Sequence, residues 1–375
     1  MHRSIALNLK QTGLSLIELM IAMLVGLILI GGVLSIFISS RQSYGINTAV
    51  GQIQEHGRFA LDFIRHATRQ AGYLGCGMSG LGFTNQLNPT GALPYNFNNA
   101  LIGYEYTGTA PTATYSIASE NPGPVAAGNW LPAPLDPSLP VAGAAYAIPG
   151  SDVLAMSMSQ GALSPAYVVL GSISGAVFDI NANVGLTPGD ILVASNCANT
   201  VVVQATNVTA GGTHIVANTG GGFTPGNSVH GIPANMGGAQ VETVNVVTFY
   251  VGEGADNAPA LFQATTDSSF ASGFQLQELV PGVENMQVLY GVDTTGSGTA
   301  SEYDTADVVT ANNYWNNVIS VRVALLLRSD TGAVTLPPAA VTYNLLGTVI
   351  QAPQDTRLRQ VFTTTIGIRN HMPNP

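Results

Sequence analysis

Residues 14–38 read LSLIELMIAMLVGLILIGGVLSIFI, and this stretch decides the fold of the 375-residue chain. Its residues are apolar except for Ser15, Glu18 and Ser35. As an α-helix the stretch would extend about 37 Å at ~1.5 Å per residue, which is enough to cross a hydrocarbon core of about 30 Å. The sequence therefore predicts a membrane-spanning helix at this position.

The residues before this stretch, MHRSIALNLKQTG, form a short polar leader that ends at Gly13. Arg3 and Lys10 are its charged residues, and basic residues beside a membrane helix keep that end in the cytoplasm. A secretory signal peptide has the opposite order, with its apolar run before the cleavage site. We therefore expect a single pass through the inner membrane, with the N-terminus cytoplasmic and the bulk of the chain periplasmic.

Glu18 is the one charged residue in the apolar stretch. A carboxylate in a membrane helix costs on the order of 3 kcal/mol at mid-bilayer and less near a helix end. Residues of this kind usually mark a function, so Glu18 is a candidate functional residue.

The helical pattern continues beyond the membrane segment, through residues 39–75. Polar residues such as Glu55, Arg58 and Asp62 occupy the helix face opposite to an apolar stripe. Glycines at 72 and 75 are expected to end the helix. Three earlier glycines, at 45, 51 and 57, favour bending or local melting. The apolar stripe consists of Ile46, Val50, Ile53, Ala60, Phe63, Ile64, Ala67 and Ala71, at the spacing of one helix face.

Charge is distributed unevenly along the chain. No Lys or Arg occurs between Arg69 and Arg322, whereas that span contains many acidic residues and the formal net charge of the chain is -10. Proteins that bind nucleic acid need cations to replace the counterions of phosphate. Nucleic acid is therefore excluded as a partner of this region.

Residues 76–375 are predicted to form a β-rich periplasmic or extracellular domain, in which residues 80–150 are rich in loops. Short runs rich in Val and Ile are bounded there by Gly, Pro, Asn or Asp, which is typical of strands. The predicted strands are residues 152–158, 166–170, 190–194, 200–204, 244–251, 287–290, 318–327 and 361–368.

The junction Gly13-Leu14-Ser15-Leu16-Ile17-Glu18 resembles the prepilin peptidase site of type IV pilins and pseudopilins. This resemblance implies cleavage after Gly13, methylation of the new N-terminus at Leu14, and Glu18 as the fifth residue of the mature chain. It also implies that Glu18 pairs with the N-terminal amine of a neighbouring subunit. The implied fold is α+β: a long helix on an antiparallel sheet, with an enlarged, loop-rich β domain.

Six segments spread over the chain carry a second resemblance. They are QEHGRFALDFIRHATRQAGYLGC (54–76), GSDVLAMSMS (150–159), GDILVASNC (189–197), LVPGVENMQVLYGVDT (279–294), WNNVISVRVALLLRS (315–329) and RQVFTTTIGIRN (359–370). These segments resemble one branch of that superfamily, the PilW family of minor pilins. The resemblance implies a structural subunit that joins other minor pilins and the major pilin at the start or tip of a type IV pilus. A J-type minor pseudopilin of type II secretion and a tip-exposed adhesin are the alternatives.

The remaining motifs give no indication of catalysis. The G-x-G-x-x-G pattern at 75–80 follows a helix and opens a loop, whereas a dinucleotide fingerprint follows a strand. The six His are scattered, and we predict no enzyme activity and no cofactor. Cys76 and Cys197 lack a metal-binding spacing and would most simply pair with each other in an oxidising compartment.

One loop has some of the oxygen ligands of a calcium site. Residues 293–304 read DTTGSGTASEYD, which places Asp293, Thr295, Ser297 and Asp304 at ligand positions and Gly298 at the turn. Relatives of the PilW type often have more carboxylates here. The sequence is compatible with a weak calcium site and with a plain glycine-rich hairpin loop, and the hairpin loop is the favoured interpretation.

Overall fold

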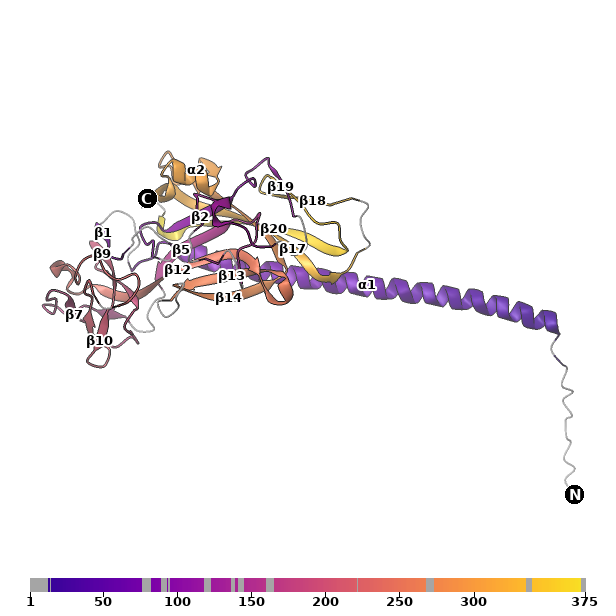
Figure 1. The fold of residues 1–375 in the computed structure, drawn as a ribbon, viewed down its shortest axis with the longest axis horizontal. Coiled ribbons are helices and arrows are strands. Elements are labelled where there is room, and N and C mark those ends of the chain that lie inside the picture. Colours follow the sequence, from indigo (N-terminus) through magenta and orange to yellow (C-terminus); the bar gives the residue numbers. More distant parts are fainter. Residues whose placement is uncertain are drawn as a thin grey trace, which may run out of the picture.

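The computed structural model describes most of the residues of the chain. These are residues 13, 15–75, 82–88, 93, 95–117, 123–135, 139–140, 145–159, 165–220, 222–267, 273–334 and 339–371. The chain consists of one long helix and a β-rich body (Figure 1). The predicted α+β class is confirmed.

The long helix, α1, runs from Leu16 to Gln70 without interruption. It extends about 80 Å at ~1.5 Å per residue, and its first half projects away from the body (Figure 1). Ala71 is the C-cap, and the next residue, Gly72, has a φ of 75°, a conformation that glycine adopts at many helix ends. The N–H of Gly72 donates to the carbonyl oxygen of Ser157 at 2.8 Å, which ties the helix end to the body.

The second half of α1 buries one face, and that face differs in part from the predicted stripe. Phe63, which belongs to the predicted stripe, is 43% exposed, whereas Leu61, which the stripe omits, is buried. The buried face is centred near Ile64; Phe63 lies about 100° around the helix from it, and Leu61 only about 60°. The buried residues of α1 are Ala49, Ile53, Gly57, Ala60, Leu61, Ile64, Ala67 and Thr68.

A four-stranded antiparallel sheet with the order β16-β15-β17-β20 covers one side of this helix face. Its strand β17 is buried on both faces: Val323 and Leu325 share a core with α1, while Leu326 packs against a smaller sheet. Burial on both faces accounts for the nearly continuous apolar sequence of this strand. The strands are β15 (Val283–Val292), β16 (Glu302–Asp304), β17 (Val318–Gly332) and β20 (Arg357–Gly367).

A ten-stranded sheet forms the centre of the body. Its main path is β1-β9-β8-β12-β5-β2-β4, with β6 and β13 also pairing with β12, and β14 pairing with β13. The pairing is antiparallel except between β1 and β9. The strands are β1 (Gly82–Asn85), β2 (Leu101–Tyr106), β4 (Trp130–Leu131), β5 (Val153–Ser159), β6 (Ala166–Tyr167), β8 (Ile191–Ser195), β9 (Asn199–Gln204), β12 (Gln240–Glu253), β13 (Pro259–Thr266) and β14 (Phe274–Pro281).

Two small sheets complete the body. The sheet β10-β11-β7 lies at the end farthest from the N-terminus (Figure 1), and β18-β19-β3 packs on β17. The strands are β3 (Thr114–Ser116), β7 (Val177–Asp179), β10 (Asn207–Thr209), β11 (His214–Val216), β18 (Thr342–Leu345) and β19 (Thr348–Gln351). The short helices are α2 (Ala306–Ala311), η1 (Ala127–Asn129), η2 (Ala234–Met236), η3 (Ala255–Asn257), η4 (Trp315–Asn317) and η5 (Arg369–His371).

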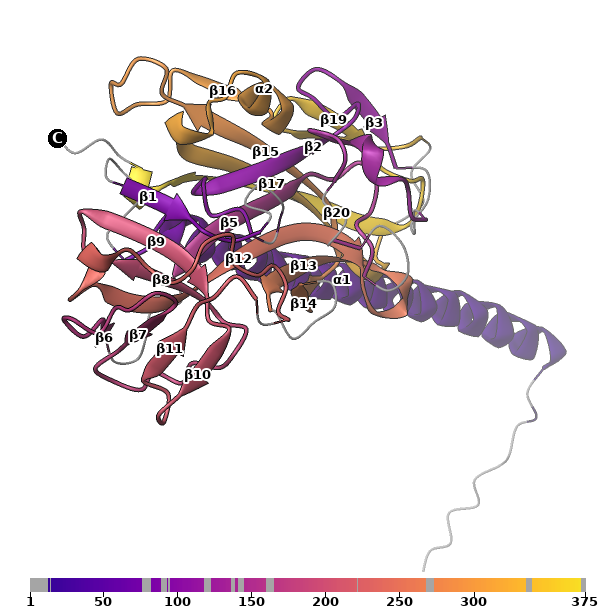
Figure 2. The same ribbon diagram turned by 60° about the vertical axis from the view of Figure 1, so that its left-hand side comes forward.

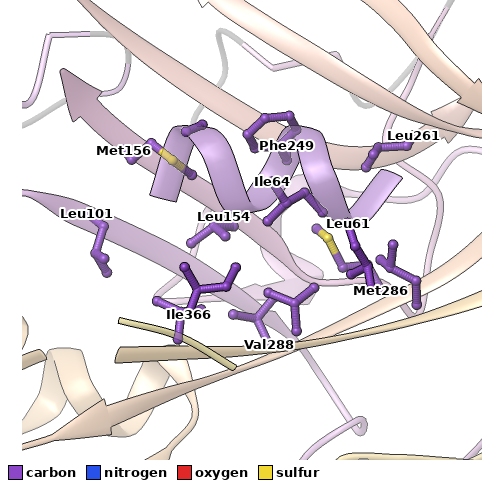
Figure 3. Packing of buried hydrophobic residues seen from close by; sticks show 14 of the residues in the cluster. Leu61, Ile64, Leu101, Leu154, Met156, Phe249, Leu261, Met286, Val288 and Ile366 are labelled. Carbon is purple, nitrogen blue, oxygen red and sulfur yellow. The ribbon is translucent and has the colours of Figure 1, made fainter. Parts of the chain in front are cut away.

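The buried face of α1 lies between the four-stranded and the ten-stranded sheets (Figure 2). Figure 3 shows Leu61 and Ile64 among Phe249 of β12, Met286 of β15 and Ile366 of β20. The helix therefore contributes to a core that both sheets share. Each of the eight predicted strands overlaps an observed one. Beyond residue 150, the strands that were not predicted are β7, β10, β11, β13, β14, β16, β18 and β19.

Candidate functional site

The N-terminal end of α1 holds the residues that the sequence singles out. Ser15 caps the helix: its backbone is extended (φ -75°, ψ 148°), and its Oγ accepts the N–H of Glu18 at 3.2 Å. Ser-x-x-Glu is the sequence pattern of a capping box, a signal that our sequence reasoning missed. The capping interaction fixes the start of the helix just after the leader and places Glu18 in its first turn.

Glu18 lies in an apolar surface that no other described part of the chain covers. Leu16, Ile17 and Met20 around it are 79%, 68% and 62% exposed. In the described part of the chain, α1 is the one helix that is long and apolar enough to cross a membrane. A carboxylate in the first helical turn is favourably placed for the positive end of the helix dipole. The Glu18 carboxylate can therefore pair with a cation when this apolar surface is covered by another molecule.

Gly13 is not required by the local structure. A Cβ built at this position meets no atom within 4 Å, and its φ is not in the left-handed range that favours glycine. The described fold therefore does not require glycine at this position, and cleavage after Gly13 stays a prediction. Leu14, the predicted methylation site, lies outside the described residues.

Cys197 lies in the turn between β8 and β9 and is disulfide-bonded. The turn is held by Asn196, whose Oδ1 accepts the N–H groups of Ala198 and Asn199 at 3.1 and 2.8 Å. Cys76 lies outside the described residues, so its pairing with Cys197 stays a prediction.

The loop proposed as a calcium site connects β15 to β16, which form an antiparallel hairpin. The carboxylate of Asp293 accepts the backbone N–H groups of Thr295, Ser297 and Gly298, at 3.0, 3.1 and 2.6 Å. Burial raises the pKa of Asp293, but these hydrogen bonds outweigh burial and hold the pKa below its usual value. The carboxylate thus organises its own loop.

Of the other predicted calcium ligands, two have hydrogen-bond partners within the loop and the third lies on a neighbouring strand. Thr295 Oγ1 donates to Asp293 Oδ1 at 3.1 Å, and Ser297 Oγ lies 2.9 Å from Thr299 Oγ1. Asp304 lies on the next strand, β16. The described residues contain no group of three or more His, Cys, Asp or Glu placed to hold a metal ion. Calcium binding stays a prediction.

Two buried carboxyl groups escaped the sequence reasoning. Asp152, just before β5, accepts the N–H of Tyr106 at 3.0 Å and that of Val288 at 2.8 Å, which connects β2 to β15. Glu105 lies beside it and accepts a hydrogen bond from Thr109 at 3.1 Å. Burial, with the nearby charge of Asp152, raises the pKa of Glu105, and burial also raises the pKa of Asp152. Only the fold brings these two groups together.

The comparisons with known proteins match both ends of the chain. Residues 8–34 match the prokaryotic N-terminal methylation motif, and residues 248–370 match the family of type IV pilus-assembly protein W (PilW). The second match contains β15, β17 and β20, the strands next to α1. No curated protein and no solved structure matches the chain.

A membrane-type helix with a methylation motif, packed on an antiparallel sheet, defines a type IV pilin-like protein. Within that class, the match over residues 248–370 and the methylation motif support a PilW-type minor pilin with a part in type IV pilus assembly. The PilW family is structural, which agrees with the scattered His residues and the absence of a catalytic motif in the sequence.

Proposed function

We propose that the protein acts at the start or tip of a type IV pilus, in a complex with other minor pilins and the major pilin. One observation carries this proposal: residues 16–38 of α1 form an apolar surface that no other described residue covers, with Glu18 as their one charged residue. Burying apolar surface is favourable by roughly 25 cal/mol per Å², so such a surface needs a bilayer or other subunits around it. Before assembly the inner membrane meets this need, with the N-terminus cytoplasmic and the body periplasmic.

In this proposal a prepilin peptidase cuts after Gly13, and Leu14 becomes a methylated N-terminus. Intact-mass spectrometry of the membrane-extracted protein, without reductant, tests this step. We expect the mass of residues 14–375 with one methyl group and with a Cys76–Cys197 disulfide, a link that stabilises by about 2–4 kcal/mol. A chain that still begins at Met1 contradicts the processing, and two free thiols contradict the disulfide.

Glu18 is the proposed assembly residue, since its carboxylate can pair with the N-terminal amine of the next subunit. Glu18→Ala should leave cleavage and membrane insertion intact, because it removes a costly polar group from the membrane segment. Incorporation should fail, so that the protein accumulates in the inner membrane and pili become fewer or disappear. The measurement is complementation of a deletion strain, with pili counted by electron microscopy and the subunit followed by immunoblot.

Glu55→Ala is the matched control, because Glu55 is an exposed carboxylate on the same helix beyond the membrane segment. It should restore piliation fully. Full complementation by Glu18→Ala would show that the protein does not enter the filament through this charge pair. Loss of exoprotein secretion with normal pili would instead support the alternative of a type II secretion pseudopilin.

A further inference from the structure

The body contains a cavity of about 490 Å³ at a split in the ten-stranded sheet. On one edge of β12, β8 pairs up to Thr243 and β13 pairs from Val247 onward. Among the described strands, none pairs with residues 244–246 on that edge, because β8 and β13 diverge there; the N–H of Val246 donates instead to Thr266 Oγ1 at 2.9 Å. The strands β8, β12 and β13 are labelled in Figure 2.

The cavity, here called the β12 cleft, is lined by Tyr95, Phe223, Thr243, Asn245, Thr266, Asp267 and residues 187–191. The lining has polar side chains on β12 and an aromatic side chain beside them. Thr243 and Asn245 lie two residues apart on β12, and so face the same side, where both are half-buried. Phe223 is half-buried and Tyr95 is 6% exposed, so the aromatic surface of the lining comes mainly from Phe223. The cleft therefore combines aromatic rings with hydroxyl, amide and carboxylate groups.

The charge of the region restricts the ligand. The β12 cleft lies in the span between Arg69 and Arg322, which contains no Lys or Arg, whereas Asp190 and Asp267 line it. Asp190 also closes the turn at its rim, where its Oδ2 accepts the N–H of Thr187 at 2.8 Å. Phosphate, sulfate and carboxylate ligands would find no cation here and would be repelled.

The mixture of groups restricts the ligand further. A purely apolar ligand would leave the polar lining without partners, at a cost of about 1–3 kcal/mol for each buried group. A saccharide ring has apolar C–H faces that pack on aromatic rings, and hydroxyl groups that both donate to carboxylates and bond with amides. The volume falls within the ~300–1,000 Å³ of small-molecule sites.

We propose that the β12 cleft binds a short neutral saccharide. Asn245 and Thr243 bond to its hydroxyl groups, and Phe223 packs against its ring face. This inference goes beyond the assembly role and does not depend on it, because the cleft lies in the body, away from the first half of α1.

The test uses the full chain in a detergent without a sugar headgroup, because an alkyl glycoside could occupy the cleft. Saturation-transfer NMR and calorimetry would be run with glucose, galactose, mannose, N-acetylglucosamine and their disaccharides. Sialyllactose serves as the anionic probe and spermidine as the cationic probe. We expect at least one neutral sugar to bind and sialyllactose not to bind.

Variants then locate the site. Asn245→Ala and Phe223→Ala should each weaken the affinity for the bound sugar about tenfold, the effect of losing one hydrogen bond or one ring contact. Asn316→Ala, at an exposed position on η4, is the matched control and should leave the affinity unchanged. Melting temperatures would confirm that all three variants are folded.

The proposal fails if none of the neutral sugars binds at millimolar concentration, or if Asn245→Ala and Phe223→Ala bind as the parent does. It also fails if spermidine binds more tightly than every sugar, since the cleft would then be an amine site. Failure here leaves the assembly proposal standing, because piliation and Glu18→Ala are measured separately.

Discussion

The two halves of α1 belong to one unbroken helix, yet their surroundings are opposite. In the first half Ile28 and Ile30 are 66% and 62% exposed, whereas in the second half Ile53 and Ile64 are 1% and 0% exposed. The same residue type thus contributes to the fold in one half only. Full burial of an isoleucine is favourable by about 1.5–3 kcal/mol, and in the first half that contribution is still to be gained.

The difference teaches that the stability of the body and the ability to assemble are encoded separately along one helix. The second half is a core element, enclosed by β15, β17 and β20 on one side and by β5 and β12 on the other. The first half contacts neither sheet and is available to a bilayer or to other subunits. Substitutions in the two halves should therefore have different consequences, which gives a direct way to test the separation.

The largest expected effect is at Ile64. Ile64→Ala should lower the free energy of unfolding by about 2–5 kcal/mol, because it leaves a cavity where two sheets and the helix meet. Ile30→Ala, the matched change in the exposed half, should stay within about 0.5 kcal/mol. Urea denaturation of the detergent-solubilised protein measures both, followed by the fluorescence of the buried Trp130 and Trp315. Equal losses would show that both halves stabilise the body.

The sequence predicted the helix well because its signals are local. The leader ending at Gly13, the apolar run and the glycine at the helix end are each contained in a few neighbouring residues. The error at Phe63 arose because a stripe drawn from spacing alone does not show where the edge of the buried face lies. Only contact with both sheets determines that Leu61, rather than Phe63, is covered.

The features that the sequence did not predict depend on distant segments. Glu284, on β15, is buried and its Oε2 lies 2.6 Å from Arg359 Nε on β20, 75 residues later in the chain. Glu105 and Asp152 likewise meet only because β2 pairs with β5. The split that forms the β12 cleft lies within one continuous strand, and the sequence of β12 does not reveal where its partners change. The resemblance at the N-terminus predicts assembly, but it does not extend to these sites.

A second test asks whether a proton helps to hold the two sheets around the buried half of α1. Glu105 faces Asp152, Thr109 and, on α2, Asp307, and the buried phenol of Tyr290 lies near both carboxyl groups. The pKa of Glu105 is raised chiefly by burial, so the folded chain holds its proton more tightly than the unfolded chain. The associated stability is complete below the ordinary Glu value of about 4.5 and falls as the pH rises towards the folded-state value.

We therefore expect the free energy of unfolding to fall by up to about 1.4 kcal/mol for each pH unit above neutrality, the slope for one proton. Glu105→Gln should flatten this part of the pH profile, since an amide has no proton to lose. Glu302→Gln, an exposed carboxyl group on β16, should leave the profile unchanged. Urea titrations at a series of pH values give the profile. A slope that survives in Glu105→Gln would assign the effect to other groups.

The smallest expected effects come from two glycines of α1, and they should have opposite signs. A Cβ at Gly57 would lie 2.6 Å from ring carbons of Phe362 on β20, whereas a Cβ at Gly51 meets nothing within 4 Å. Gly57→Ala should therefore destabilise the protein by about 1–3 kcal/mol through overpacking. Gly51→Ala should stabilise it by up to about 1 kcal/mol, because alanine loses less backbone entropy in a helix. Adding Phe362→Leu to Gly57→Ala should recover part of the loss, since the smaller side chain leaves room for the methyl group. If both single variants were stabilised equally, the ring of Phe362 would have to move aside, and β20 would not restrict the side chain at residue 57.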